Sequence, residues 1–218
     1  MTTPHRLRPE LGEMPLNMLS LPVDERGYPI PWFVATLVDG SRDFRVMDAR
    51  KRERAHLDRV CWVCGSRLGA NFTFVVGPMC AINSVSAEPP SHKGCAEWSV
   101  RNCPFLVRPH MVRRANDLPE EYAEVPGMIP RNPGVTLAWT ARSYKLAPQG
   151  DNYVFVMGKP TEVSWWREGR AATHEEARES MESGLPKFIE ACKGDGRLLE
   201  QVQRDYERAC QLMPARAI

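Results

Sequence analysis

The sequence predicts an α+β protein on three observations: alternating strand segments, helices preceded by capping residues, and two pairs of metal-type ligands. Strands are expected, from their alternation and their β-branched or aromatic content, at residues 32–38, 44–46, 72–76, 135–139, 153–157 and 162–166. Helices are expected at residues 49–60, 92–102, 174–183 and 196–213. No internal repeat is present, so we expect a small antiparallel sheet with helices after it.

Turn and capping residues support the elements of the N-terminal half. Residues 1–30 are rich in proline and are expected to form an irregular arm. The Asp39-Gly40 pair is expected to close a hairpin between the first two strands. Asp48 can cap the helix that leads to the first cysteine pair, and residues 83–91 are expected to form a loop before the next helix.

The C-terminal half carries its own local signals. Residues 148–152 are expected to form the turn between strands 135–139 and 153–157. The spacing of Thr173 and Glu176 is that of a capping box, and we expect Gly184 to close the helix that starts there. The last helix, which Asp195 can cap, has an apolar stripe at Leu199, Val202, Tyr206, Ala209, Cys210 and Met213.

Composition bounds the surface and the compartment. The chain of 218 residues has 43% hydrophobic and 26% charged residues and a net charge of +2, so any nucleic-acid contact must come from a local patch. No apolar run approaches the ~18 residues of a membrane span, and the N-terminus lacks a secretory pattern. We therefore expect a cytoplasmic protein with no membrane partner. Five of the seven cysteines lie within residues 61–103, which favours metal binding over disulfides in a reducing compartment.

The most specific motif is a pair of ligand steps. Cys61 and Cys64 form a Cys-x-x-Cys turn, and His92 and Cys95 form a His-x-x-Cys step at the start of a helix. A tight turn lets two thiolates meet one ion, and the helix start places an imidazole and a third thiolate on one face. The spacing predicts one zinc ion bound by these four residues. Glu97, on the following helix, is a candidate outer partner of the site.

This order of turn, strand and ligand-bearing helix resembles a treble-clef zinc finger over residues 57–103. The resemblance implies a zinc knuckle at Cys61 and Cys64, with Gly65 in the left-handed turn. It leads to an expected domain organisation in which residues 1–115 are a zinc-binding α+β domain with the irregular arm, 116–133 a proline-rich linker, and 134–218 a strand-plus-helix domain.

Other uses of the cysteines remain open. An iron–sulfur cluster could use Cys61, Cys64, Cys95 and Cys103, although this leaves His92 without a role. Cys103 follows Cys95 by eight residues, about 12 Å of helical rise, so it is more simply a buried thiol. Cys80 could replace His92 as fourth ligand or act as a nucleophile, but a cysteine in an apolar stretch is more often packed.

Most enzyme signatures are absent from the sequence. The zinc deaminase, metalloprotease, phosphate-binding loop and Gly-x-Ser-x-Gly patterns are not found. An HNH nuclease is the enzyme class that comes closest in architecture, yet the strand before the helix lacks the Asp-His or His-His pair typical of that class. Glu88 with His92 is the only substitute. We therefore assign no catalytic residue, and the metal-dependent nuclease is kept as the alternative function.

Candidate partner-binding residues fall into two basic groups and an aromatic pair. They are Arg50, Lys51 and Arg52 before the knuckle, Arg101, Arg108, His110, Arg113 and Arg114 after the metal helix, and Trp165 and Trp166. The basic groups form a phosphate-facing patch if the fold brings them together, and otherwise they are solvated faces. Neighbouring strand residues face opposite ways, so we expect one tryptophan to be buried and the other to be available.

Four stretches look like an uncharacterised protein family of bacteria and their phages. They are 24–34 (DERGYPIPWFV), 61–65 (CWVCG), 77–83 (GPMCAIN) and 86–92 (SAEPPSH). No activity is known for that family, so the resemblance implies only a bacterial or phage intracellular protein. The function expected from the sequence is a zinc-stabilised module that binds a protein or nucleic-acid partner, with a regulatory role in a bacterial or phage process.

Overall fold

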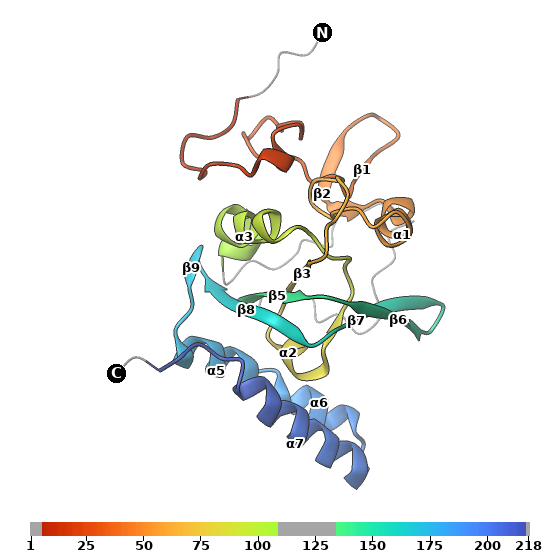
Figure 1. The fold of residues 1–218 in the computed structure, drawn as a ribbon, viewed down its shortest axis with the longest axis vertical. Coiled ribbons are helices and arrows are strands. Elements are labelled where there is room, and N and C mark those ends of the chain that lie inside the picture. The colour runs from red at the N-terminus through yellow and green to blue at the C-terminus, as the bar shows by residue number, and fades with distance from the viewer. Residues whose placement is uncertain (1–5, 109–133, 217–218) are drawn as a thin grey trace.

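The computed structural model describes residues 6–108 and 134–216, and it confirms the predicted α+β class. Antiparallel sheets form the middle of the molecule, and helices lie on both sides of them (Figure 1). The N-terminal arm, the first hairpin and the helix with the candidate ligands lie above the sheets in this view, and the last helices lie below.

The N-terminal part follows the predicted order. Its elements are the 3-10 helix η1 (Leu16–Met18), the strands β1 (Val34–Thr36) and β2 (Arg42–Met47), and the helix α1 (Ala49–Leu57). β1 and β2 pair as the expected hairpin. Asp48 caps α1, because its carboxylate accepts a hydrogen bond from the backbone N–H of Arg50 at 3.0 Å.

The strands form two antiparallel sheets. One has the order β3 (Phe72–Val76), β5 (Thr136–Ala141), β8 (Pro160–Arg167) and β9 (Arg170–Ala171). The other has the order β4 (Val85–Ser86), β7 (Asn152–Met157) and β6 (Tyr144–Gln149). The predicted strands correspond to β1, β2, β3, β5, β7 and β8. β4, β6 and β9 are additional, and β4 lies within the segment expected to be a loop.

β5, β6, β7 and β8 together form one long hairpin with a bend. Ala141 pairs with Pro160, and the backbone N–H of Gly158 donates to the carbonyl oxygen of Ser143 at 3.0 Å, so pairing continues through the bend. The register shifts by one residue near Thr161, which is a β-bulge. A Cβ on Gly158 would overlap the Ser143 carbonyl oxygen, so glycine is required there. The predicted turn is the tip of this hairpin; it joins β6 to β7, whereas the sequence suggested β5 to β7.

Helix α3 (Lys93–Asn102) covers one face of the first sheet. Lys93 binds Glu162 of β8 at 2.7 Å, and the guanidinium of Arg101 lies 4.6 Å from the ring centroid of Trp166. The β3 and β5 residues on this face contain no aromatic side chain, which lets the helix approach closely. They are Thr73, Val75, Thr136, Ala138 and Thr140.

The opposite face of this sheet is aromatic and forms the core. Phe74 pairs with Trp139 there, and both are almost fully buried. Trp165, on the same face of β8, donates its indole N–H to the carbonyl oxygen of Leu212 at 2.6 Å. The segment that follows the last helix is thereby bound to the sheet. The two faces therefore separate the ligand-bearing helix from the C-terminal helices.

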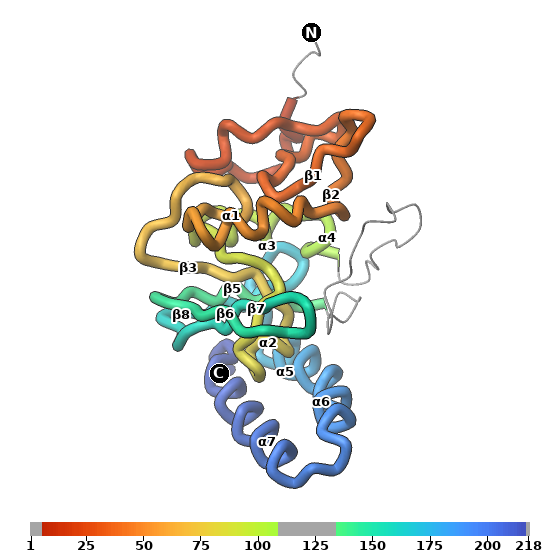
Figure 2. The backbone as a smooth tube through the Cα atoms, turned by 90° about the vertical axis from the view of Figure 1, so that its right-hand side faces the viewer, coloured from red at the N-terminus to blue at the C-terminus, as the bar shows by residue number. Residues whose placement is uncertain are grey.

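The C-terminal helices are α5 (His174–Glu182), α6 (Leu185–Ala191) and α7 (Gly196–Cys210). Figure 2 shows α6 and α7 joined at the end furthest from the sheets. Asp195 caps α7 as predicted, with its carboxylate accepting the N–H of Arg197 at 2.9 Å. Ser183, not Gly184, ends α5, and Gly184 instead precedes α6, which the sequence did not predict.

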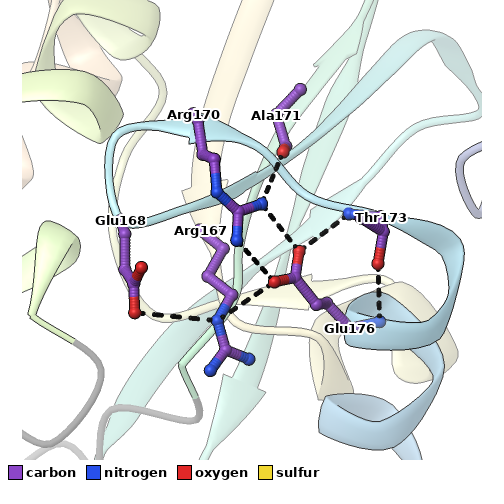
Figure 3. A network of polar contacts seen from close by, with 6 residues as sticks. All are labelled: Arg167, Glu168, Arg170, Ala171, Thr173 and Glu176. Carbon is purple, nitrogen blue, oxygen red and sulfur yellow. Dashed lines mark hydrogen bonds and ion pairs between the residues drawn. The ribbon is translucent and has the colours of Figure 1, made fainter.

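The predicted capping box opens α5. The Thr173 hydroxyl accepts the backbone N–H of Glu176 at 3.2 Å, and the Glu176 carboxylate accepts the N–H of Thr173 at 2.9 Å. The same carboxylate binds Arg170 at 2.6 Å and Arg167 at 3.4 Å, as Figure 3 shows. Both arginines come from the end of the β8–β9 ribbon, so this network attaches α5 to the sheet.

The predicted domain boundary does not divide the sheets or the core. β3 precedes residues 116–133 and β5 follows them, yet the two strands pair along their whole length. β4 and β7 also pair across the same boundary. One hydrophobic core includes residues from both sides, such as Phe74 and Trp139. Residues 116–133 themselves lie outside the described residues.

Candidate metal centre

The four side chains predicted to bind a metal converge in the structure. The ligand atoms of Cys61, Cys64, His92 and Cys95 all lie within 4.8 Å of one another, so this group can hold one metal ion. The three cysteines are buried and His92 is half-buried. In a tetrahedral site with metal–sulfur bonds of about 2.3 Å, neighbouring ligand atoms are about 3.8 Å apart, so only a small contraction is needed for coordination.

A tight turn holds the first two ligands. The N–H of Gly65 donates to the carbonyl oxygen of Cys61 at 2.8 Å, and the N–H of Cys61 donates to the carbonyl oxygen of Ser66 at 2.8 Å. Gly65 has a φ of 74°, the left-handed conformation predicted there. A Cβ on Gly65 would lie 2.5 Å from the ring of Trp32. Gly65 is therefore required for the shape of the turn and for the packing of Trp32 against it.

The start of α3 brings the other two ligands. His92 caps the helix, its backbone N–H donates to the sulfur of Cys61 at 3.3 Å, and Cys95 lies in the first turn. The preceding residue, Ser91, pairs with Thr73 of β3 through hydrogen bonds of 3.0 and 2.7 Å. The sheet thus positions the helix start against the turn, although the ligands of the turn and of the helix are 28 to 34 positions apart in the sequence.

The imidazole of His92 is oriented for binding through Nδ1. That atom lies 3.4 Å from the sulfur of Cys64 and 3.9 Å from the sulfur of Cys95. Nε2 lies 3.0 Å from the backbone carbonyl oxygen of Arg67. A carbonyl oxygen only accepts, so Nε2 carries the hydrogen and the lone pair of the neutral ring is on Nδ1. Arg67, not Glu97, supplies the acceptor next to Nε2, and the recorded ion pair of Glu97 is with Lys93 at 3.8 Å.

The thiols influence one another's ionisation. Hydrogen bonds from Cys64 and Cys95 hold the pKa of Cys61 well below its ordinary value. Contact with Cys61 raises the pKa of Cys64 and of Cys95. The hydrogen bond to Cys61 also raises the pKa of His92. The group therefore favours one thiolate at Cys61, and a bound cation would favour the thiolate form of all three cysteines.

The remaining candidate cysteines lie outside this group. Cys103 follows the last residue of α3 and is not among the four converging ligands. Burial raises the pKa of its thiol. Cys80 lies on the short helix α2 (Met79–Asn83), where burial raises its pKa to about 11. Cys80 is outside the converging group, and a thiol with a raised pKa is not an activated nucleophile.

The basic residues of α1 do not act as one surface. Arg52 is buried and donates to the carbonyl oxygen of Ala87 at 3.1 Å, to that of Tyr153 at 2.6 Å and to the side chain of Asn152 at 3.0 Å. Its role is to connect α1 to the β6–β7 hairpin, which corrects its assignment as a partner-binding residue. The sequence did not reveal this, because neighbouring helix residues point 100° apart and only tertiary packing shows which one is inside.

The two neighbours of Arg52 differ in exposure. The side chain of Arg50 is 91% exposed and lies 3.6 Å from Asp48. Lys51 donates to the carbonyl oxygen of Val34 at 2.9 Å and lies 5.8 Å from the ring centroid of Trp32. Partial burial lowers the pKa of Lys51. Lys51 therefore helps to attach α1 to the hairpin, and only Arg50 remains as a fully solvated cation.

The second group is described only in part. Trp165 is buried, whereas Trp166 is half-buried beneath Arg101, as expected for adjacent strand residues. Arg108 is exposed and follows the short helix α4 (Pro104–Val107), which was not predicted. His110, Arg113 and Arg114 lie outside the described residues. Thus Arg101 and Trp166 are the candidates of this group that the structure brings together.

Two features of the centre were not found in the sequence. The Arg67 carbonyl and the stacking of Trp32 on Gly65 are backbone and packing contacts, for which a residue pattern has no signal.

No helix in the described part of the chain is both long enough and apolar enough to cross a membrane. A scan of known protein families and searches of curated proteins and of solved structures found no match to this chain.

Proposed function

We propose that the four ligands bind one structural zinc ion, and that the protein is a zinc-stabilised binding module for a protein or nucleic-acid partner. The observation that carries the proposal is the closed ligand set. Three sulfur atoms and Nδ1 of His92 lie within 4.8 Å of one another, and the second ring nitrogen of His92 is already bonded to Arg67. A site with four protein ligands is typical of structural zinc.

The donor chemistry supports zinc over the other common metals. Thiolates and imidazoles suit zinc, whereas magnesium and calcium prefer oxygen ligands. The ligands come from a turn and a helix separated by β3, so an ion would add a further link between segments that are distant in the chain. The seven cysteines are free, which supports a reducing compartment such as the cytoplasm.

Binding is favoured over catalysis by the same geometry. A catalytic zinc keeps a coordination position for water, and four protein ligands fill the tetrahedral shell. The nuclease alternative needs a histidine available to a second metal or to a water molecule, but both ring nitrogens of His92 are engaged. Glu88 is not part of the converging group either. No observation in the described residues favours the nuclease, so it stays an untested alternative.

The test is metal analysis joined to unfolding. We expect about one zinc per chain from protein purified without added metal, and tetrahedral thiolate bands in the visible spectrum after cobalt(II) replacement. Chelation under reducing conditions should abolish or strongly lower the cooperative thermal transition, because binding and folding are coupled at such sites. A metal-free protein that melts at the same temperature would contradict the structural role. A brown protein containing iron would instead support the cluster.

A further inference from the structure

A group of exposed cations lies where the metal turn, β3 and the bend of the long hairpin meet. We call this group the basic corner; its members are Arg59, Arg67, Arg142 and Lys159. The sequence pointed to Arg59 as part of the basic group before the knuckle, but not to Arg67, Arg142 or Lys159. They come from segments far apart in the chain, so only the fold brings them together.

Strand pairing brings together the backbone segments that carry three members. The guanidinium of Arg59 lies 5.0 Å from the ring centroid of Phe72, the first residue of β3. Phe72 pairs with Ala141, the residue before Arg142. The register continues through the bend from the Ala141 pair to the Gly158–Ser143 hydrogen bond, which places Arg142 opposite Lys159. Directly opposed strand residues have Cβ atoms about 5 Å apart.

Arg67 reaches the same corner through the metal turn. Val60 and Arg67 form an isolated β-bridge, and the N–H of Leu68 donates to the carbonyl oxygen of Arg59 at 2.7 Å. Arg67 is therefore beside Arg59 in the chain path that flanks Cys61 and Cys64. Its carbonyl oxygen is bonded to His92, while its side chain is exposed. The basic corner is thus part of the wall of the metal centre.

The charge of the corner is not balanced by acidic residues. None of its four members forms an ion pair with a carboxylate of the described residues. Residues 59–87, 134–150 and 152–161, which contribute the corner, contain no aspartate or glutamate at all. The flanking carboxylates are already used: Asp58 binds Arg54 at 3.2 Å, and Glu162 binds Lys93 at 2.7 Å. A local positive potential therefore persists in a chain with a net charge of only +2.

Two features of the corner oppose stability. Arg142 and Lys159 are like charges in the two segments that join β5 to β6 and β7 to β8, and like charges on neighbouring segments are destabilising. Arg59 has a φ of 51°, at the position after a helix end where glycine is usual. A non-glycine residue in this conformation costs about 1 kcal/mol. Strained or repelling positions of this kind are often found at functional sites.

We propose that the basic corner binds the phosphate backbone of a nucleic acid. This inference rests on the proposed function and names its partner. Protein interfaces usually bury an apolar centre. Backbone phosphates need only a row of cations, and arginine can bind a phosphate through two hydrogen bonds. The α6–α7 hairpin lies below the sheets in Figure 1, on the side opposite α3.

The experiment compares two matched double variants. R142Q/K159Q removes two charges from the corner, and K187Q/R197Q removes one lysine and one arginine charge from α6 and α7, where neither forms an ion pair with a described carboxylate. Fluorescence anisotropy is measured with labelled 20-mer single strands and duplexes of two unrelated sequences, over a range of salt. An acidic peptide of equal charge is the competing probe.

We expect parent and K187Q/R197Q to bind with equal affinity and R142Q/K159Q to bind about tenfold more weakly or worse at low salt, for both sequences alike. The slope of log K against log salt should fall by about 2, one unit for each lost phosphate contact. Equal binding by all three proteins, equal weakening of both variants, or no binding by the parent would overturn the proposal. A preference for the acidic peptide would also overturn it, in favour of a protein partner.

The outcome is separable from that of the zinc proposal. Metal content and melting temperature are measured for the same three proteins. R142Q/K159Q should keep one zinc and melt no lower than the parent, because it removes a repulsion and no ligand. If nucleic-acid binding fails while zinc content and stability are intact, the basic corner is refuted and the zinc-stabilised module stands. If chelation leaves the parent fold unchanged, the zinc proposal fails by itself.

Discussion

Nε2 of His92 lies 3.0 Å from the backbone carbonyl oxygen of Arg67, and this contact determines which ring nitrogen faces the thiols. Because the carbonyl can only accept, it selects the tautomer with a lone pair on Nδ1. Arg67, which supplies the acceptor, lies just after the metal turn, so the turn segment orients a ligand carried by the helix. The site is therefore pre-organised by backbone contacts rather than by an acidic side chain.

We predict that H92A loses metal affinity strongly, whereas E97A does not. His92 supplies the fourth donor, whereas Glu97 is outside the converging group and forms an ion pair with Lys93. Competition with a chromogenic chelator should show a fall of at least about 100-fold for H92A and a change within about twofold for E97A. A large loss in E97A would show that Glu97 acts on the site after all.

Removing a ligand cysteine should cost far more than removing a buried cysteine elsewhere. Cys61 and Cys192 are both buried, at 0% and 6% exposure, so C61A and C192A leave cavities of similar size. C61A also removes the ion, and we expect it to lose its cooperative transition. The thiol of Cys192 donates a hydrogen bond to the carbonyl oxygen of Phe188. C192A removes this bond and should lower the free energy of unfolding by about 1–2 kcal/mol. Similar melting curves for the two variants would remove the case for a structural ion.

G65A should destabilise the protein more than G194A. Both glycines have a left-handed φ, 74° and 81°, so both substitutions carry a backbone cost of about 1–2 kcal/mol. Only at Gly65 would the new Cβ also meet Trp32, at 2.5 Å; nothing lies within 4 Å at Gly194. Urea unfolding should give a total loss of about 3 kcal/mol for G65A, and equal losses would show that Trp32 moves aside without cost.

R52M is expected to destabilise the fold, because it keeps an unbranched stem but removes the guanidinium group. It leaves the carbonyl oxygens of Ala87 and Tyr153 without their donor inside the protein. The loss should be about 2–4 kcal/mol by urea unfolding. Arg50 lies two residues before Arg52, on the solvent-exposed side of α1. R50M should therefore change the free energy of unfolding by no more than about 0.5 kcal/mol. No change in the free energy of unfolding for R52M would show that Arg52 is not needed to connect α1 to the hairpin.

Stability should fall in acid partly through Glu176. Its hydrogen bond with Arg170 lowers its pKa from 4.5 to about 2 in the folded protein (Figure 3). The lowered pKa contributes stability that is fully present above about pH 4.5, the unfolded value, and is lost as the pH falls from there through about 2. Unfolding of the parent and of E176Q at about pH 6 and about pH 3 should show a smaller acid loss in the variant. E179Q, on the exposed side of α5, should behave as the parent does.

Local chemistry let the sequence determine part of this protein. The Cys-x-x-Cys and His-x-x-Cys steps, the left-handed Gly65, and the caps at Asp48, Thr173 and Asp195 depend on residues within a few positions of one another. Such contacts form from neighbouring chain and leave a readable pattern. The α+β class follows for the same reason, because alternation and helical period are local properties.

The tertiary structure decided everything that joins distant segments. The pairing of β3 with β5 overrides the boundary expected at residues 116–133, because alternation shows that a strand exists but not which strand pairs with it. Burial of Arg52 and assembly of the basic corner have the same origin. The sequence does not reveal whether a charged residue faces solvent, a carbonyl oxygen or another cation, because its neighbours are determined by long-range packing.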